Sequence, residues 1–181
     1  MATHSFRLVN EGKAMRATRM TFYRILFTAL FLALAWQTAY GASEANLAQN
    51  GSYNEANILQ EWSADLFPAS DLNMVAAEQQ GHDHFLQIEQ GGAATMAAVW
   101  QNGNSQEALL FQAGYANEID LRQSGCANRV EVSQEGQNNW AGLVQRGEQN
   151  FAVLDQYGGG NMFTITQDGN GNVARVTQTS Y

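Results

Sequence analysis

The stretch QEGQNNWAGLVQRGEQNFAVLDQ, residues 134–156, places a glutamine at every eleventh position, at Gln134, Gln145 and Gln156. Each of these glutamines is followed after two positions by glycine and after five by asparagine. Such a fixed period indicates a repeat architecture, in which every unit adopts the same local structure. That structure must therefore place the amide side chains in equivalent environments at intervals of eleven residues.

The same spacing continues through most of the 181 residues. Small or apolar residues stand seven and nine positions after each glutamine, as Ala141 and Leu143 do after Gln134. We expect the amides to form the structural ladder of the fold, at positions Gln49, Gln60, Gln79, Gln90, Gln101, Gln112, Gln123, Gln134, Gln145, Gln156, Gln167, Gln178, Asn54, Asn73, Asn117, Asn128, Asn139, Asn150, Asn161 and Asn172.

The repeated positions differ by two, which is the period of a β-strand, so their side chains share one face. Each unit then reads as a strand of about seven residues and a turn of about four, in which glycine supplies a positive φ. A strand this short is not stable alone. Stacked amides satisfy each other, whereas an unpaired buried amide costs about 1–3 kcal/mol. The sequence therefore predicts an all-β, two-strands-per-rung β-solenoid, amyloid-like, of about six 22-residue rungs.

The N-terminal residues 1–41 have the features of a signal peptide with an extended n-region. Arg16, Arg19 and Arg24 form a positive n-region before the apolar run ILFTALFLALAW at 25–36, which is short for a membrane span, and Ala39-Tyr40-Gly41 fits a cleavage site. An uncleaved anchor is the alternative, and a true start at Met15 or Met20 stays open.

After the leader, residues 42–60 are predicted to form the first rung. The segment 61–72 is twelve residues long, whereas the other predicted turns have about four residues, so we expect an inserted surface loop here. The eleven-residue spacing then resumes over 73–181.

The chain beyond residue 41 is strongly acidic, with four arginines against sixteen acidic residues and hence a formal charge of −12. Such a surface repels nucleic acid and anionic lipid, so neither is an expected partner. The single cysteine, Cys126, excludes an intrachain disulfide. It is expected to be inert, with intermolecular pairing as the alternative.

No catalytic, cofactor-binding or metal site is expected. His82 and His84 are the only paired candidate ligands, but His84 stands in an asparagine position and no third ligand has suitable spacing. Serine and histidine share no repeat position, which argues against a nucleophile and base. An enzyme on a β-helix and a monomeric solenoid binding ice or glycans are the alternatives. The latter needs a flat array of identical outward residues, and the outward residues here are mixed.

The outward positions are unusually apolar and suggest a sticky lateral or adhesive face. They include Met96, Trp100, Leu109, Phe111, Trp140, Val144, Phe151, Val153 and Met162. Stacking at a separation of 22 residues also predicts a salt bridge between Glu107 and Arg129 and a cation–π contact between Trp100 and Arg122.

The spacing Gln-x-Gly-x-x-Asn-x-Ala-x-x-x-Gln resembles the curlin repeat, as in QNGSYNEANILQ (49–60), QRGEQNFAVLDQ (145–156) and QDGNGNVARVTQ (167–178). Curlins are secreted subunits of curli, the functional amyloid fibres of bacterial biofilms. The resemblance implies a β-solenoid exported through an outer-membrane secretion pore with accessory factors. It also implies assembly with itself and other curlin subunits into an extracellular fibre that adheres to cell or abiotic surfaces. The match weakens at Thr95 and Gln106, which fill asparagine positions, and at Trp62, which fills a glycine position.

Curlin systems have a major fibre subunit and a minor, nucleating subunit. The major subunit usually carries a glycine-rich leader before its repeats, whereas ASEANLAQNG (42–51) enters the repeat directly. The ending ARVTQ (174–178) also resembles the minor subunit, although the basic last repeat typical of that subunit is reduced here to Arg175. The resemblance favours the minor subunit, with the major subunit as the alternative.

Overall fold

The computed structural model describes residues 2–9, 43–62 and 72–180, and all the regular structure in these ranges is β-strand. The strands are β1 (Ala2–Val9), β2 (Glu44–Ser52), β3 (Glu55–Trp62), β4 (Met74–His82), β5 (Phe85–Ala93), β6 (Met96–Asn104), β7 (Glu107–Tyr115), β8 (Glu118–Cys126), β9 (Arg129–Gln137), β10 (Trp140–Glu148), β11 (Phe151–Gly159), β12 (Met162–Asp168) and β13 (Val173–Thr179). None of the described residues forms a helix long and apolar enough to cross a membrane.

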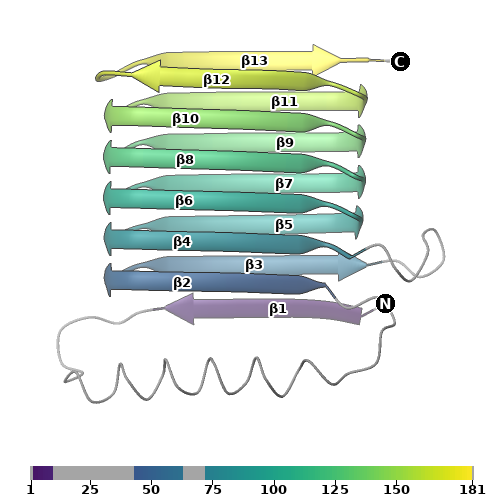
Figure 1. Ribbon diagram of the computed structural model, residues 1–181, viewed down its shortest axis with the longest axis horizontal. Coiled ribbons are helices and arrows are strands. Elements are labelled where there is room, and N and C mark those ends of the chain that lie inside the picture. The colour runs from purple at the N-terminus through teal and green to yellow at the C-terminus, as the bar shows by residue number, and fades with distance from the viewer. Residues whose placement is uncertain (1, 10–42, 63–71, 181) are drawn as a thin grey trace.

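Strands β2 to β13 alternate between two stacked sheets, so that the chain climbs one rung with every pair of strands (Figure 1). The order is β12-β10-β8-β6-β4-β2 in the six-stranded sheet and β1-β3-β5-β7-β9-β11-β13 in the seven-stranded sheet. Within each stack the pairing is parallel and joins like positions, for example Gln123 with Gln145 and Gln145 with Gln167. The predicted two-strand β-solenoid is confirmed.

The core is a thin apolar layer between the two sheets. Ala141 and Leu143 enter it from β10, and Ala152 and Leu154 enter it from β11, all four at most 1% exposed. Two inward apolar residues, two positions apart, recur on successive strands, as with Ala97 and Val99 on β6 and Ile119 and Leu121 on β8, and they fill the narrow space between the two sheets. The side chains between these positions point outward, as strand alternation requires.

The strand boundaries differ from the predicted ones. The predicted strands have about seven residues, whereas strand β10 has nine, Trp140–Glu148, and continues three residues past Gln145. Only Gln149 and Asn150 separate it from β11. The backbone stays paired beyond the glutamine because each rung follows the path of its neighbour around the turn.

The repeated glycine is required for two physical reasons, as Gly125 illustrates. Its φ of 109° is outside the range that L-residues favour, and an added Cβ would overlap the carbonyl oxygen of Gly147 on the next rung. Two positions later the chain again has positive φ, but there the value is near the left-handed helical region and non-glycine residues are accepted. Ser105, with φ of 54°, and Asn138, also with φ of 54°, are examples.

Strand β1 lies in the segment that the sequence assigns to the leader. It pairs with β3 in antiparallel fashion, from Ala2 opposite Trp62 to Val9 opposite Glu55. The apolar run and cleavage motif lie outside the described residues, as does 63–71 of the expected loop. Strand β3 continues to Trp62, so the first two residues assigned to that loop belong to the strand.

We predict that Gly125→Ala lowers the free energy of unfolding by at least about 2 kcal/mol, through backbone strain and steric overlap with the rung above. Gly91→Ala is the control, because Gly91 precedes the turn glycine and its added Cβ would meet only the Gln112 carbonyl oxygen, at 3.9 Å. It should change stability by less than about 1 kcal/mol. Urea unfolding followed by circular dichroism measures both. Equal effects would show that the turn does not demand glycine.

Candidate functional site: the amide ladders and the open edges

The glutamines form one continuous hydrogen-bonded column in each sheet. Each Nε2 donates to the Oε1 of the glutamine on the next rung, as from Gln123 to Gln145 at 3.0 Å and from Gln145 to Gln167 at 2.7 Å. In the other sheet, Gln134 donates to Gln156 at 2.8 Å. The columns run through Gln49, Gln79, Gln101, Gln123, Gln145 and Gln167 and through Gln60, Gln90, Gln112, Gln134, Gln156 and Gln178.

From Gln60 onward, each glutamine of the columns also connects the two sheets. The second N–H of Gln145 donates to the carbonyl of Arg129 on β9, at 3.0 Å, and Gln134 on β9 donates to the carbonyl of Glu118 on β8 in the same way. The amide thus closes one end of the core while using both N–H groups and its carbonyl. Full pairing removes the penalty of burying it.

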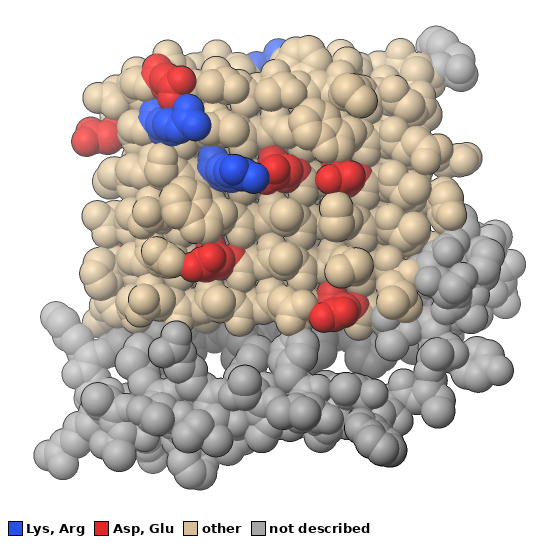
Figure 2. All heavy atoms as spheres, viewed as in Figure 1, with Lys and Arg blue, Asp and Glu red and all other residues tan. Residues whose placement is uncertain are grey.

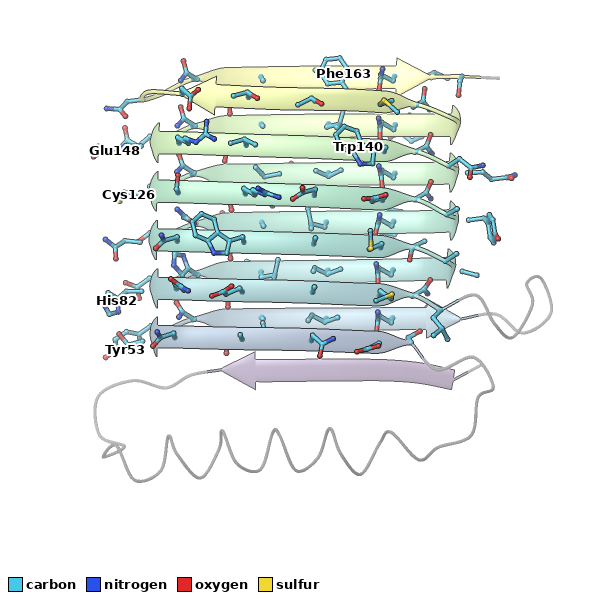
Figure 3. The ribbon with its side chains drawn as sticks, in the orientation of Figure 1. Tyr53, His82, Cys126, Trp140, Glu148 and Phe163 are labelled. Carbon is cyan, nitrogen blue, oxygen red and sulfur yellow. The ribbon has the colours of Figure 1, made fainter. Side chains whose placement is uncertain are left out.

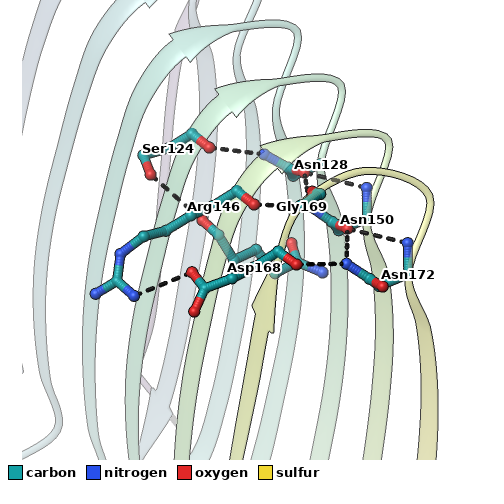
Figure 4. Close-up of polar contacts among 8 residues, drawn as sticks. Ser124, Asn128, Arg146, Asn150, Asp168, Gly169 and Asn172 are labelled. Carbon is teal, nitrogen blue, oxygen red and sulfur yellow. Dashed lines mark hydrogen bonds and ion pairs between the residues drawn. The ribbon is translucent and has the colours of Figure 1, made fainter.

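The asparagines form a second pair of columns that holds the turns (Figure 4). Asn150 is hydrogen-bonded to the preceding rung, because its backbone N–H and its Nδ2 donate to Oδ1 of Asn128 at 3.1 and 3.0 Å. The same Nδ2 reaches the carbonyl of Arg146 in its own turn at 3.2 Å and that of Gly169 on the next rung at 2.7 Å. One side chain therefore fixes two successive turns. At the last rung Asn172 is exposed and lacks such a neighbour above.

His84 takes the place of an asparagine and reproduces most of its bonds. It is 1% exposed, and its backbone N–H donates to Asn54 Oδ1 at 3.2 Å. Its Nδ1 accepts the backbone N–H of Gln106 at 3.3 Å, so the neutral ring carries its proton on Nε2, which donates to the Gln80 carbonyl at 2.9 Å. Burial lowers the pKa of His84. The bond to Gln80 raises it, and the charges of His82 and Asp83 lower and raise it respectively.

Gln106 is the weak point of the same column. Its Nε2 reproduces the two asparagine bonds, to the carbonyls of Asn102 and Gly125 at 2.8 and 3.3 Å. Its Oε1 is buried without a hydrogen-bond partner. Thr95, in the other column, is accommodated better because its hydroxyl donates to Asn73 Oδ1 at 2.9 Å. The sequence shows where asparagine is replaced but not which replacement leaves an atom unpaired.

On the outer surface, one of the two predicted contacts across rungs is present. Arg129 Nη1 lies 2.8 Å from Glu107 Oε2, as predicted. The predicted contact between Trp100 and Arg122 is wrong. The two residues are adjacent in register, but Arg122 turns along its own strand to Asp120, with Nη2 and Oδ2 3.2 Å apart. An ion pair two residues away on the same strand competes with the exposed ring.

The candidate residues His82 and Cys126 lie along one edge of the stack, where Tyr53 and Glu148 also project from the turns (Figure 3). The Nδ1 of His82 is hydrogen-bonded to the Ser52 hydroxyl at 2.7 Å. The described ranges contain no group of three or more His, Cys, Asp or Glu residues placed to hold a metal ion.

The last rung, β12 and β13, leaves both glutamine columns open at the C-terminal end. Gln167 Nε2 donates to the Phe151 carbonyl at 3.1 Å, and Gln178 Nε2 donates to the Met162 carbonyl at 3.3 Å. No further glutamine lies above either of them in the described part of the chain. Each therefore has an amide N–H to offer to another rung.

The opposite end of the stack is complementary in hydrogen bonding. Gln49 and Gln60 donate upward, but their Oε1 atoms accept nothing from the described residues 43–62 and 72–180. One end of the solenoid thus presents amide donors and the other presents amide acceptors, at the same positions of the rung.

These features define a class of protein: a β-solenoid with internal amide ladders, an open C-terminal edge, and an N-terminal edge with complementary amides at which β1 covers β3. A family model described as the curlin associated repeat matches residues 141–169, a segment that includes Gln145, Gln156 and Gln167. The match covers 29 of the 181 residues and shows that this segment is similar to the curlin associated repeat. This family consists of secreted structural proteins of extracellular fibres rather than of enzymes. No curated protein and no solved structure matches the chain.

We predict that Gln145→Glu destabilises the fold at pH 7 by about 1–3 kcal/mol, because the carboxylate cannot donate to Gln167 or to the Arg129 carbonyl. Burial raises the pKa of a glutamate here, so stability should return as the pH falls through that value toward 4.3, the usual value for glutamate. Gln137→Glu, in an exposed turn, is the control and should have little effect. Urea midpoints at pH 7 and 4 measure both. A tolerant Gln145→Glu would place this amide outside the stabilising column.

We predict that acid weakens the rung around His84. Because the pKa of His84 is lower in the folded chain than the ordinary histidine value of 6.5, the unfolded chain binds the proton first. Stability should decline as the pH falls below about 6.5 and level off below the folded pKa. His84→Asn should remove this decline, whereas His82→Asn, in the exposed turn, should retain it. Unfolding free energies from pH 8 to 5 provide the measurement, and identical slopes for all three proteins would contradict the prediction.

Proposed function

We propose that this chain is a secreted structural subunit of curli-type functional amyloid fibres, which grow as solenoids stack end to end. The observation that carries this proposal is the complementarity of the two edges. If β12 of one copy is followed by β2 of the next, and β13 by β3, both sheets continue in parallel register. The donor of Gln167 then meets the acceptor of Gln49, and Gln178 meets Gln60.

This contact is heterologous and does not close on itself, so repeated addition gives a filament. An exposed strand edge with unpaired backbone groups is a template for such addition. Removal of residues 1–41 would take β1 away from β3 and free the N-terminal edge of the seven-stranded sheet. Leader cleavage and growth competence are thereby linked, and the addition of each copy to the filament forms no covalent bond.

The finer role that we propose is that of the minor, nucleating subunit, which would hold the cell surface and template other curlin subunits. The sequence features that separate minor from major subunits support it, as does the irregular N-terminal rung, where Trp62 replaces the turn glycine. Passage through a dedicated secretion pore and adhesion in a biofilm belong to the same proposal. A nucleating subunit accelerates assembly of a second curlin at substoichiometric amounts, whereas a major subunit forms bulk fibre alone.

A proline on the last rung tests end-to-end growth. The N–H of Trp140 bonds upward to the Asn161 carbonyl, and alternate residues of a parallel strand point the same way. Thr164, two residues beyond the equivalent of Trp140 on β12, therefore presents its N–H to the open edge. Thr164→Pro removes that donor and obstructs the approaching strand, and it leaves the internal bonds intact.

We expect Thr164→Pro to slow elongation from preformed seeds about tenfold or more, because both pairing and strand approach are impaired at the growing edge. Thr164→Ala is the control and should elongate normally. Thioflavin fluorescence with a fixed number of seeds measures the rate, and circular dichroism confirms that the fold is retained. Normal elongation of a folded Thr164→Pro chain would contradict growth through this edge.

A further inference from the structure

The outer face of the six-stranded sheet is nearly flat along its centre and carries few charges (Figure 2). Small or short side chains make up most of its middle column, which consists of Ala76, Ala98, Asp120, Gly142 and Thr164. The ring of Trp140 lies over Gly142, where an added Cβ would meet its Cη2 at 2.5 Å. The indole therefore lies flat against the sheet and buries the glycine (Figure 3). A flat apolar strip of this kind suits face-to-face packing of sheets.

Strand β8 carries three outward-facing charges, arranged about the middle column, and Glu44 on β2 and Glu78 on β4 are further carboxylates on the same face. Glu118 and Arg122 stand two residues to either side of Asp120. Arg122 is paired with Asp120 but its side chain is 64% exposed. Glu118 has no ion-pair or side-chain hydrogen-bond partner in the described ranges. One carboxylate and one guanidinium are therefore available for an external contact.

We propose that two solenoid filaments pack against each other through this face, related by a two-fold axis that runs along the stacking direction over the middle column. The inference rests on the proposed fibre function. Under this rotation Glu118 of each copy faces Arg122 of the other, which gives two ion pairs for every pair of copies. Asp120, on the axis, faces its own counterpart, and each Asp120 carboxylate keeps its pair with Arg122 of its own chain. The same rotation sets Met96 opposite Trp100, a favourable sulfur–aromatic contact, and sets Trp140, whose ring reaches over Gly142, opposite Val144.

The direction of the two-fold axis determines the polarity of the pair. An axis along the strands, centred on β6, would instead place Arg122 opposite Glu78 and Glu118 against Met74. Under the proposed axis the carboxylate placed against Met74 is that of Glu78, which accepts a hydrogen bond from Gln80. Under the alternative axis it is that of Glu118, which has no such bond, so its burial against methionine would cost more. The arrangement along the stack is favoured, and it makes both filaments grow in the same direction.

The opposite face is less suited to this packing. The seven-stranded sheet has a hollow of about 270 Å³ lined in part by Glu89, Glu131 and Asp155. Its central cation, Arg129, is already bound to both Glu107 and Glu131, at 2.8 and 2.7 Å. Two such faces would bring together the carboxylates of Glu89 and Asp155, which have no ion-pair partner among the described residues, and this opposes association.

The area of the face explains when pairing occurs. Six strands of about seven residues cover about 650 Å² per copy, from strand spacings of about 4.8 Å and rises of about 3.3 Å. This is below the roughly 800 Å² per partner of a standard stable interface. Single copies therefore stay unpaired, and association accumulates only when many copies are joined in a filament.

The test measures filament width by electron microscopy and elongation rate by thioflavin fluorescence, using filaments of the secreted chain. We expect Arg122→Glu to reduce the fraction of paired filaments about tenfold or more, because it places like charges opposite each other twice per pair of copies. Elongation should continue. Arg146→Glu is the matched control, since Arg146 has the same charge, is 61% exposed and lies at the turn. It should leave pairing unchanged.

A charge swap decides the geometry. Glu118→Arg combined with Arg122→Glu restores both ion pairs under the proposed axis and should recover pairing. If Glu78→Arg combined with Arg122→Glu recovers it instead, the filaments are antiparallel and the proposed axis is wrong. Single-width filaments of the unaltered chain would overturn the pairing and leave the proposed function intact, whereas a chain that forms no filaments would overturn the proposed function itself.

Discussion

The structure depends on one requirement: a buried amide must find a partner on every rung. Gln145 meets it by accepting from Gln123 below, donating to Gln167 above and donating across the core to β9. A shift of register by one residue would turn these amides outward and the apolar residues with them. The ladders thus define the register that the short strands could not define by packing alone, and the eleven-residue period follows from that need.

The same requirement explains why the ends of the solenoid can form hydrogen bonds with another copy. Inside the stack an amide is fully paired, whereas at the first and last rungs the same group retains an unused acceptor or donor. Most folded proteins protect strand edges with charge, proline or a covering element. Here the described edge strands β12 and β13 have no such cover, and the end of one copy matches the start of another. Stability within the chain and growth between chains therefore arise from the same hydrogen bonds.

Much of the fold was predictable because the repeat determines the alternation within each strand and the contacts between rungs. The two-residue alternation identified the inward face, and the 22-residue separation placed Arg129 beside Glu107. Other features depend on local geometry that a periodic pattern does not encode. The left-handed turn position is occupied by residues as different as Ser105 and Asn138, so its conformation leaves little trace in the sequence. Whether Arg122 turns along its strand or across rungs depends on competition between neighbouring groups, which spacing does not decide.

The most direct test of the central claim is the hydrogen exchange of glutamine side-chain amides, measured by NMR on the assigned chain. If the ladders hold the solenoid together, the Nε2 protons of Gln112, Gln123 and Gln134 exchange as slowly as the backbone amides of the core strands. The exposed amide of Gln137 in the adjacent turn exchanges at the rate of a free side chain. Equally fast exchange at all four positions, in a chain whose core backbone is protected, would contradict the claim that stacked amides organise this fold.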